Sequence, residues 1–344
     1  MVFISILLYS LLYSVFKSFW VQLYNMKMVK QSYAQNWSAY NKAQMNEKQL
    51  FMELLCDLCN DAEEPEYVFG RLKIPVADIL FCSAFKIYSG YSGRRFTTDM
   101  RTAKEDNYIS KVPHYNSLFN FLKNLNTSAI LMKMIQKSGL SLKDVETKFA
   151  IDASGFSTTR YRRWFDFKYG HERDFRIWVK AHVVCGVGTN IVTAVRLSEA
   201  RAHDNKFFKE LINDTSSNFN VCEMSADKAY MSRNNLELVD SLGGKAYIPF
   251  RSNVTGKQRG SKLWGKMYHY FKYNNEDFMK HYHLRSNVES TFSMIKRKFG
   301  DTVRSKDKTA QFNEILCKIL CHNICVVIHE MHEMGFYKKT EWAS

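Results

Sequence analysis

The stretch "HYHLRSNVESTFSMIKRKFG", residues 281–300, holds a single carboxylate, Glu289, among several cations. The stretch is typical of a helix, and at about 3.6 residues per turn, offsets of four and seven return to nearly the same face. Tyr282, Arg285, Glu289 and Lys296 therefore share one stripe. An adjacent apolar stripe can pack on a core and consists of Val288, Phe292, Ile295 and Phe299. An ion pair on a solvated face would explain only why Arg285 precedes Glu289 by one turn.

Two aspartates on expected strands accompany this glutamate. In "KFAID", Phe149 and Ile151 face one way, and Ala150 and Asp152 face the other. "NVCEMSAD" is expected to be a short strand that ends at Asp227. An aspartate at a strand end often only starts a turn. Ion pairing on a helix, however, gives no reason for two strand aspartates, so these three carboxylates are the candidates for chemistry.

The elements that carry these residues form a recognisable order from residue 148 onward. "KFAID", "DFRIWVKAHVVCG" and "NIVTAVRLSE" are expected strands, with a turn from Gly186 to Asn190 between the last two. A helix "DNKFFKELIND", the strand "NVCEMSAD", a helix "SRNNLELVDSLGG" capped by Ser232 and a strand "KAYIPF" follow. A basic, aromatic loop is then expected before the helix of Glu289. This order predicts an α/β fold with a mixed sheet and flanking helices.

Residues 29–145 are expected to form a helical DNA-binding domain. Arg94 and Arg95 stand at the start of an expected helix, "RRFTTDMRTAKED", directly after the turn "SGYSGRR". Short helices with exposed arginines near a turn suit a helix-turn-helix reader of DNA. An ordinary helical bundle is the alternative, because no specific helix-turn-helix motif can be matched.

The first 28 residues form a hydrophobic extension, and sixteen of them precede the first charge at Lys17. A membrane span needs about twenty apolar residues, and a signal peptide begins with positive charge and has a cleavage site. The favoured interpretation is an extension outside the fold, with a packing helix and a membrane anchor as alternatives. Residues 146–335 are expected to form the sheet-containing domain and residues 336–344 a tail.

The formal net charge of +15 favours a polyanionic partner. The cations are spread along the chain, and nucleic acid is preferred over an anionic membrane. The eight cysteines do not suggest a disulfide framework. Cys56 and Cys59 form a lone C-x-x-C without the second pair of ligands that a zinc site needs, so zinc is not expected. A reducing cytoplasm, in association with DNA, fits this cysteine usage best.

The pattern Y-x2-R-x3-E-x6-K, formed by Tyr282, Arg285, Glu289 and Lys296, resembles that of the DDE transposases of bacterial and archaeal insertion sequences, in the groups numbered four and five. "IDASGF" and "SADKAYMSRNN" are similar to the other two acidic motifs of that family, and "RSKDKTAQFNEILCKILCHNICVV" to its C-terminal helix. The resemblance covers roughly residues 70–330. The large β-insertion of some relatives is not expected, because the interval from Asp227 to Glu289 is short.

The resemblance implies a ribonuclease-H-like mixed sheet with flanking helices, preceded by the helical DNA-binding region. It implies a catalytic triad of Asp152, Asp227 and Glu289 that holds two Mg²⁺ ions, for which Mn²⁺ can substitute. Two such ions activate the attacking hydroxyl and neutralise charge on the entering and leaving oxygens, and hard cations prefer carboxylate ligands. Arg285 and Lys296 would position the DNA backbone.

The same resemblance gives Tyr282 a sugar or a phosphate as its partner. The partners implied are double-stranded DNA, as terminal inverted repeats and target, and a second copy of the chain when assembled on DNA; a membrane is not expected. The function implied is cleavage of element ends and strand transfer into target DNA. The alternatives are a catalytically retired DNA-binding protein, a ribonuclease-H-like structure-specific nuclease and, from the first 24 residues alone, a membrane-associated protein.

Overall fold

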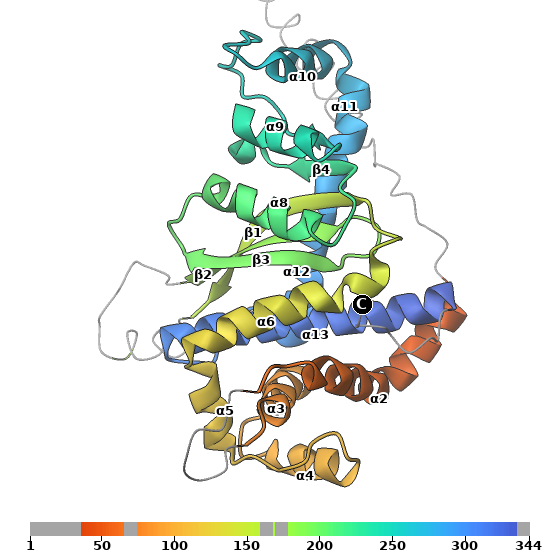
Figure 1. Ribbon diagram of the computed structural model, residues 1–344, viewed down its shortest axis with the longest axis vertical. Helices are drawn as coiled ribbons and strands as arrows, with labels where there is room; N and C mark the ends of the chain where they lie inside the picture. The colour runs from red at the N-terminus through yellow and green to blue at the C-terminus, as the bar shows by residue number, and fades with distance from the viewer. Residues whose placement is uncertain (1–35, 65–73, 159–167, 169–177, 336–344) are drawn as a thin grey trace, which may run out of the picture.

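A mixed five-stranded sheet lies in the middle of the molecule (Figure 1). The computed structural model describes residues 36–64, 74–158 and 178–335, together with Lys168. The strands are β1 (Lys148–Ser157), β2 (Trp178–Gly186), β3 (Val192–Glu199), β4 (Glu223–Ala226) and β5 (Lys245–Tyr247). Their order is β3-β2-β1-β4-β5; β1 pairs antiparallel with β2 and parallel with β4. The predicted α/β fold with a mixed sheet is confirmed, while the hydrophobic extension and the tail lie outside the described residues.

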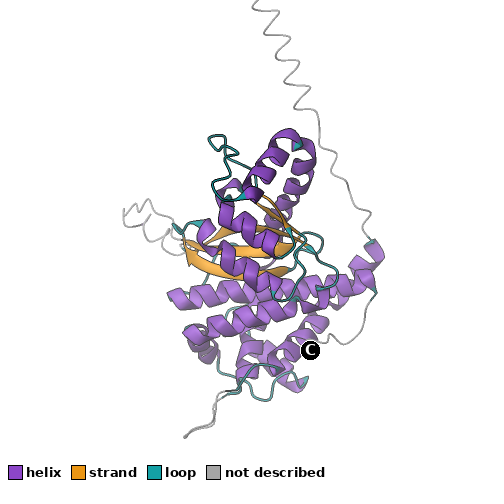
Figure 2. Ribbon diagram, turned by 45° about the horizontal axis from the view of Figure 1, so that its top comes forward, coloured by secondary structure: helices purple, strands orange, loops and turns teal. Residues whose placement is uncertain are grey.

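Helices cover both faces of the sheet (Figure 2). One side carries α8 (Phe208–Ser216), α9 (Arg233–Ser241), α10 (Lys262–Tyr273) and α11 (Asn275–Tyr282). The other carries α12 (Ser286–Phe299), α13 (Lys308–Met334) and the N-terminal helices. The alternation expected for β1 is confirmed, because Phe149 and Ile151 belong to the hydrophobic cluster of the first side and Ala150 to that of the second.

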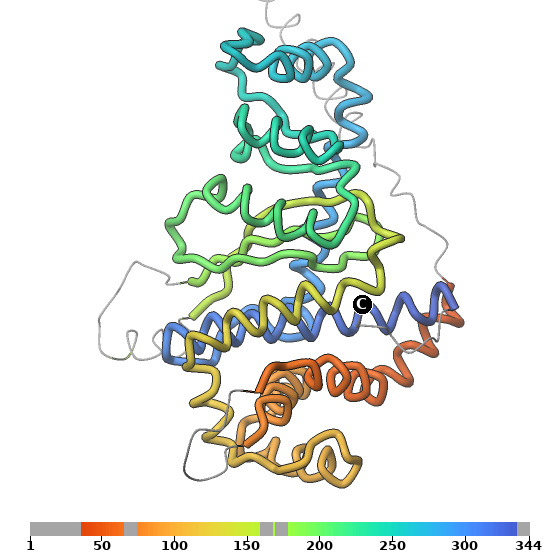
Figure 3. Tube along the Cα trace, in the orientation of Figure 1, coloured from red at the N-terminus to blue at the C-terminus, as the bar shows by residue number. Residues whose placement is uncertain are grey.

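The N-terminal helices pack around α13. They are α2 (Trp37–Asn60), α3 (Val76–Ser89), α4 (Thr97–Glu105), α5 (Tyr115–Leu122) and α6 (Leu125–Ser138). The chain segments of α2 and α13 are far apart in sequence but lie side by side (Figure 3). One hydrophobic cluster runs from these helices through α13 to the sheet, so the expected boundary at residues 145/146 falls within a shared core. The division of the chain into domains stays a prediction.

Helix α13 is buried on nearly all sides. By length and composition it could cross a membrane, but 83% of its most apolar window is buried inside the protein, as in the core helix of a globular fold. The polar side chains along it have partners within the protein. The Asn323 amide donates to the Val192 carbonyl oxygen at 2.8 Å and accepts from the Val192 N–H at 2.9 Å. A helix side chain thus satisfies backbone groups of the edge strand β3.

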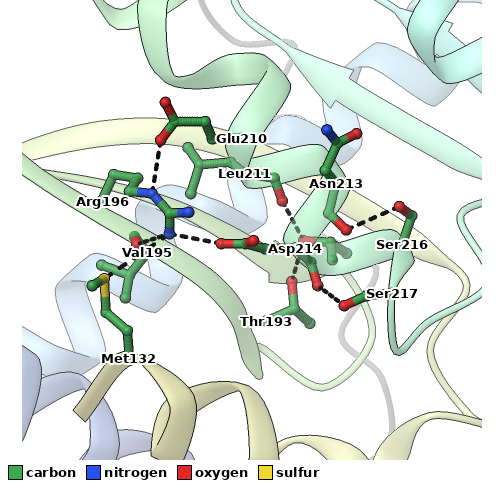
Figure 4. A network of polar contacts seen from close by, with 11 residues as sticks. Met132, Thr193, Val195, Arg196, Glu210, Leu211, Asn213, Asp214, Ser216 and Ser217 are labelled. Atoms are coloured by element: carbon green, nitrogen blue, oxygen red, sulfur yellow. Dashed lines mark hydrogen bonds and ion pairs between the residues drawn. The ribbon is translucent and has the colours of Figure 1, made fainter. Parts of the chain in front are cut away.

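Helix α8 is fixed to β3 by polar contacts as well as by packing (Figure 4). Arg196 on β3 pairs with Glu210 and Asp214 on α8, at N–O distances of 3.0 and 2.6 Å. Below this pair the buried hydroxyls of Thr193 and Thr215 lie 2.9 Å apart. These contacts hold the edge strand and so stiffen the sheet on which the candidate site is built.

The segment after residue 250 differs from the expected loop, because it contains α10 and α11. Ser261 caps α10 by accepting a hydrogen bond from the Trp264 N–H. Trp264, Met267, Tyr268 and Phe271 recur at helical spacing and pack into the cluster beneath. Lysines within and beside this stripe, at positions 262, 266 and 272, obscure the apolar pattern in the sequence.

Candidate active site

Asp152 and Asp227 are brought together by the pairing of β1 with β4. The last register pair between these parallel strands is Ile151 with Ala226, and the next residue on each strand is an aspartate. β4 ends at Ala226 while β1 continues to Ser157, so from Asp152 onward β1 has no paired strand on the β4 side. The carboxyl ends of neighbouring strands are the usual place for ligands in open α/β sheets. Asp227 also caps the short turn Lys228–Tyr230 (η3).

The stretch 281–300, expected to be a single helix, is broken into three parts. Tyr282 ends α11, His283–Arg285 form a 3₁₀ turn (η4), and α12 carries Glu289 and Lys296. The tighter turn changes the direction of the stripe, so Tyr282 packs against the hydrophobic cluster under α10 and α11. Glu289 lies in the first turn of α12, where the helix dipole favours a negative charge, and the last turn is basic.

Arg285 joins two of the three carboxylates. Its Nη1 lies 2.7 Å from Asp152 Oδ2, and its Nη2 lies 2.5 Å from Glu289 Oε1. The side chain of Asp152 is 24% exposed and that of Glu289 is 59% exposed. The ion pair between Arg285 and Glu289 is therefore present, but Arg285 also reaches across to the sheet. An exposed helical pair alone would not make this second contact.

Negative charge is in excess around Asp152, which favours the binding of a cation. Burial raises the pKa of Asp152, and the nearby carboxylates Asp227 and Glu289 raise it further. The Ala153 N–H, 2.8 Å from Asp152 Oδ1, and the guanidinium of Arg285 lower this pKa but do not reverse the shift. Three carboxylates within electrostatic range of each other need more positive charge than one guanidinium supplies.

A pocket opens between β1 and α12. Three carboxylates and two cations line it, with hydroxyls between them: Asp152, Glu289, Asp301, Lys296, Arg297, Ser154 and Ser293. Lys296 Nζ donates to Ser154 Oγ at 2.7 Å, and its ammonium lies 5.2 Å from the centre of the Phe156 ring. Burial lowers the pKa of Lys296. Arg285 contacts Asp152 and Glu289, and Asp227 acts on Asp152 electrostatically, but neither Arg285 nor Asp227 is part of the pocket wall.

Two predicted DNA-binding residues lie elsewhere. Arg94 and Arg95 are exposed in the turn before α4, which lies at the opposite end of the molecule from α10 (Figure 1). They do not join the pocket. The structure does not test their role or that of Tyr282, and both stay predictions.

Some residues at the site were not singled out from the sequence. Ser154 lies two positions after Asp152 on the same strand face, a spacing that could have identified it. Tyr230 is 1% exposed, and its hydroxyl has no hydrogen-bond partner among the described residues. Burial, followed by the nearby carboxylates, raises the pKa of Tyr230. Its place in "SADKAYMSRNN", three residues after Asp227, was the available signal.

In the described part of the chain, one group of potential metal ligands has all its ligand atoms within 4.8 Å, and it is not this site. It consists of His329, Glu330 and Glu333 near the end of α13. His329 Nδ1 lies 3.4 Å from Glu333 Oε2, and hydrogen bonding to Glu330 raises the pKa of His329. These contacts make the group a network of ion pairs. The ligands of two ions about 4 Å apart need not be so close to one another, so the carboxylates at the pocket are a different arrangement.

Comparison with known families gives a match that contains the whole site. The family model described as "Transposase DDE domain" matches residues 143–324, which is more than half of the chain and includes Asp152, Asp227 and Glu289. Comparisons with curated proteins and with solved structures give no match. The matched region runs from just before β1 into α13, so it spans the sheet and all the elements that position the three carboxylates. On this match the chain belongs to the transposase DDE-domain family.

Proposed function

We propose that this protein cuts the ends of its own DNA element and joins them to target DNA by two-metal phosphoryl transfer. Its catalytic core would be ribonuclease-H-like, of the type found in groups four and five of the insertion-sequence transposases. The observation that carries this proposal is the meeting of Asp152, Asp227 and Glu289 from three separate elements at one edge of the sheet. Such an arrangement is what a pair of divalent cations requires.

The donor set fits hard divalent cations such as Mg²⁺, or Mn²⁺ in its place. The three residues offer carboxylate oxygens alone. Asp152 is close enough to both Asp227 and Glu289 to interact with them electrostatically, so it is the residue that would bridge two ions. When bound, the ions supply activation of the attacking hydroxyl and neutralisation of the leaving oxygen. Arg285 now balances part of this charge and would be free to turn to a DNA phosphate once the carboxylates have another partner.

The surface around the site supports DNA as the substrate. Between Leu242 and Asn275 the sequence contains no aspartate or glutamate. Seven cations of this segment are exposed and form no ion pair among the described residues: Lys245, Arg251, Lys257, Arg259, Lys262, Lys266 and Lys272. The segment leads through α11 directly to Arg285 and Glu289. Together with Lys296 it gives a continuous set of phosphate contacts, and Arg94 and Arg95 would hold DNA at the far end of the molecule.

The substrate defines the assembly that we propose. An element has two ends that must both be joined to one target. A dimer of this chain, formed on the DNA, would provide one active site for each end. The two ends would be inverted repeats, which are expected directly outside the gene.

The test is Glu289→Gln in the full chain, with cleavage of a duplex that carries the flanking repeat in Mg²⁺. The change keeps the size of the side chain and removes one ligand charge, so cleavage should fall by orders of magnitude while DNA binding persists. The Mg²⁺-dependent rise of Tm, which reports cation binding to the folded state, should fall with it. Glu237→Gln on the exposed face of α9 is the matched control and should behave as the unmodified protein.

The outcomes separate the proposal from its rivals. Near-normal cleavage by the Glu289→Gln protein would overturn the catalytic assignment. Unmodified protein that binds the repeat but never cleaves it would be a retired DNA-binding derivative. Cleavage without joining of the ends to a second duplex would point to a structure-specific nuclease.

A further inference from the structure

A second pocket lies where the loop after α12 meets the end of α3 and the first half of α13. We call it the loop pocket. Three cations line it, Lys86, Arg304 and Lys318, together with the carboxylates of Asp301 and Glu314. Asp301 also lines the pocket of the candidate active site, so the two pockets are neighbours.

Two of these charged groups are already engaged by the protein. The Glu314 carboxylate accepts hydrogen bonds from the backbone N–H groups of Arg304 and Ser305, at 2.9 and 2.8 Å. The Lys318 ammonium donates to two carbonyl oxygens of the loop at residues 300–302, at 2.9 and 2.8 Å. Both side chains therefore shape the loop, and neither depends on a ligand to satisfy its charge.

Lys86 is different, because the residue is 8% exposed and its side chain has no hydrogen bond or ion pair within the described part of the chain. Its ammonium lies over the ring of Phe119, 5.5 Å from the centre. Burial lowers the pKa of Lys86, and Glu314 and Arg304 act on it in opposite directions. The side chain of Lys86 is largely buried, and its ammonium reaches the pocket without a partner, so a neighbouring anion would offset part of the cost of burying this charge.

The pocket leaves room for such an anion at its mouth. Gly90 and Gly300 line it with left-handed backbones, at φ +70° and +85°. A Cβ built on either glycine would meet no atom within 4 Å. Arg304 is exposed and donates from its Nη1 to the Gly90 carbonyl oxygen at 2.7 Å, and its other guanidinium N–H groups make no hydrogen bond within the described part of the chain. Lys86 and Arg304 can therefore hold one tetrahedral anion between them.

We infer that the loop pocket binds a phosphate group of the DNA backbone through Lys86 and Arg304, an inference that rests on the proposed function. The loop is tied to the strand of the catalytic aspartate. The Ser157 N–H donates to the Asp301 carbonyl oxygen at 3.0 Å, and the Val303 N–H donates to the Ser157 carbonyl oxygen at 2.8 Å. A phosphate held there has a fixed position relative to Asp152.

The strand gives the expected distance. Ser157 is five residues after Asp152 on β1, which at about 3.3 Å per residue is on the order of 16 Å. Duplex DNA rises about 3.4 Å per base pair, so for a duplex that lies along β1 the phosphate bound here would be roughly five nucleotides from the one that is cleaved. The loop pocket would then set the register of the cut.

The first measurement uses inorganic phosphate as the probe, with Tm followed against phosphate at constant ionic strength. The unmodified chain should gain stability with phosphate, and Lys86→Met should not. Lys48→Met is the matched control, because Lys48 also lies over a phenylalanine ring, 6.0 Å from the centre of Phe85, but is exposed and outside the pocket. In chloride alone Lys86→Met should be at least as stable as the unmodified chain, since it removes an unpaired buried charge. Lys86→Gln gives a second variant in case methionine packs badly.

The second measurement uses duplexes with single methylphosphonate substitutions along each strand. One position, roughly five nucleotides from the cleaved phosphate, should weaken binding of the unmodified chain by about tenfold and leave binding by Lys86→Met unchanged. Phosphate binding without any such position would mean a site for free phosphate and would overturn the assignment to DNA. A Tm that ignores phosphate in the unmodified chain, with no sensitive position on the DNA, would overturn the site altogether. Neither readout requires cleavage, so a failure of the catalytic proposal remains distinguishable.

Discussion

At the scale of single residues, the site is defined by how one guanidinium connects two elements. Arg285 contacts Asp152 on the sheet and Glu289 on α12, while Lys296 reaches from α12 to Ser154 on the same strand as Asp152. Two cations therefore bind α12 to β1 in the absence of DNA. Each has a role in the folded protein that would compete with the phosphate contact that we propose for it, so their substitution must be designed to keep packing.

Lys296→Met makes that separation. Methionine keeps the aliphatic contact with the rings of Phe156 and Phe292 but removes the charge. If Lys296 contacts phosphate, DNA affinity should fall, and the slope of log K against log salt should decrease by about one unit. The control is Lys209→Met on the exposed face of α8. An unchanged salt slope for Lys296→Met would mean that the lysine serves only to join α12 to β1.

At the scale of elements, α13 is the structure around which the N-terminal helices and the sheet assemble. It is expected from the apolar composition of "EILCKILCHNICVV", but its buried polar residues each need a specific partner that sequence does not reveal. Asn323 is the clearest case. Its amide makes, with the backbone N–H and carbonyl groups of Val192, the two hydrogen bonds that a further strand beside β3 would make. It also donates to Ser138 Oγ on α6 at 2.9 Å.

Asn323→Leu should therefore destabilise the fold far more than its volume change suggests. The buried N–H and carbonyl groups of Val192 would both lose their partner, at a cost of about 1–3 kcal/mol each. Asn41→Leu on the exposed face of α2 is the matched control. Urea unfolding followed by circular dichroism gives both free energies of unfolding. A loss for Asn323→Leu no larger than for the control would show that water replaces the amide.

The elements also show where sequence reasoning stops. Strand alternation around Asp152 and the apolar stripe of α12 could be predicted, because each depends on local periodicity. The 3₁₀ turn at His283–Arg285 could not, because it results from the meeting of α11 with the sheet: Ser225 Oγ donates to the His281 carbonyl oxygen at 3.0 Å. Helix α10 was hidden for another reason, since its cations resemble those of a loop. The contact of Arg285 with Asp152 follows from this tertiary arrangement and has no counterpart in the local pattern.

At the scale of the whole molecule, the order of strands predicts the mixed sheet, but not which helices share its core. The N-terminal helices join α13 and one face of the sheet in one hydrophobic cluster, so strand β1 of the candidate site and the exposed arginines before α4 belong to one continuous packed unit. Differences in composition along the sequence distinguish these regions, but they do not predict contacts between residues more than a hundred positions apart. The whole chain carries a formal net charge of +15, which leaves its fold sensitive to further positive charge as pH falls.

Two buried histidines make that sensitivity measurable. Burial lowers the pKa of His182 on β2 and of His322 on α13, each to about 4, and His322 Nε2–H donates to the Asn190 carbonyl oxygen at 2.9 Å. In the unfolded chain a histidine has a pKa of about 6.5. Between pH 6.5 and 4 the unfolded chain therefore takes up protons that the folded chain excludes, so stability falls as pH falls through this window. Each histidine contributes about 3 kcal/mol across it.

His322→Gln should reduce this acid sensitivity. Glutamine can still donate to the Asn190 carbonyl oxygen but cannot be protonated, so between pH 6 and 4.5 the free energy of unfolding should fall less steeply, by about 1.4 kcal/mol per pH unit, which corresponds to one proton.

His329 acts in the opposite direction, because its pKa is raised by the hydrogen bond to Glu330, and its contribution is complete below pH 6.5 and lost as pH rises through its folded-state pKa. The exposed His203, which makes no capping hydrogen bond with its side chain, provides the control as His203→Gln. Urea unfolding at several pH values in chelator measures all three proteins, and an equally steep decline for His322→Gln and the unmodified chain would show that the buried histidine is not the source of the acid sensitivity.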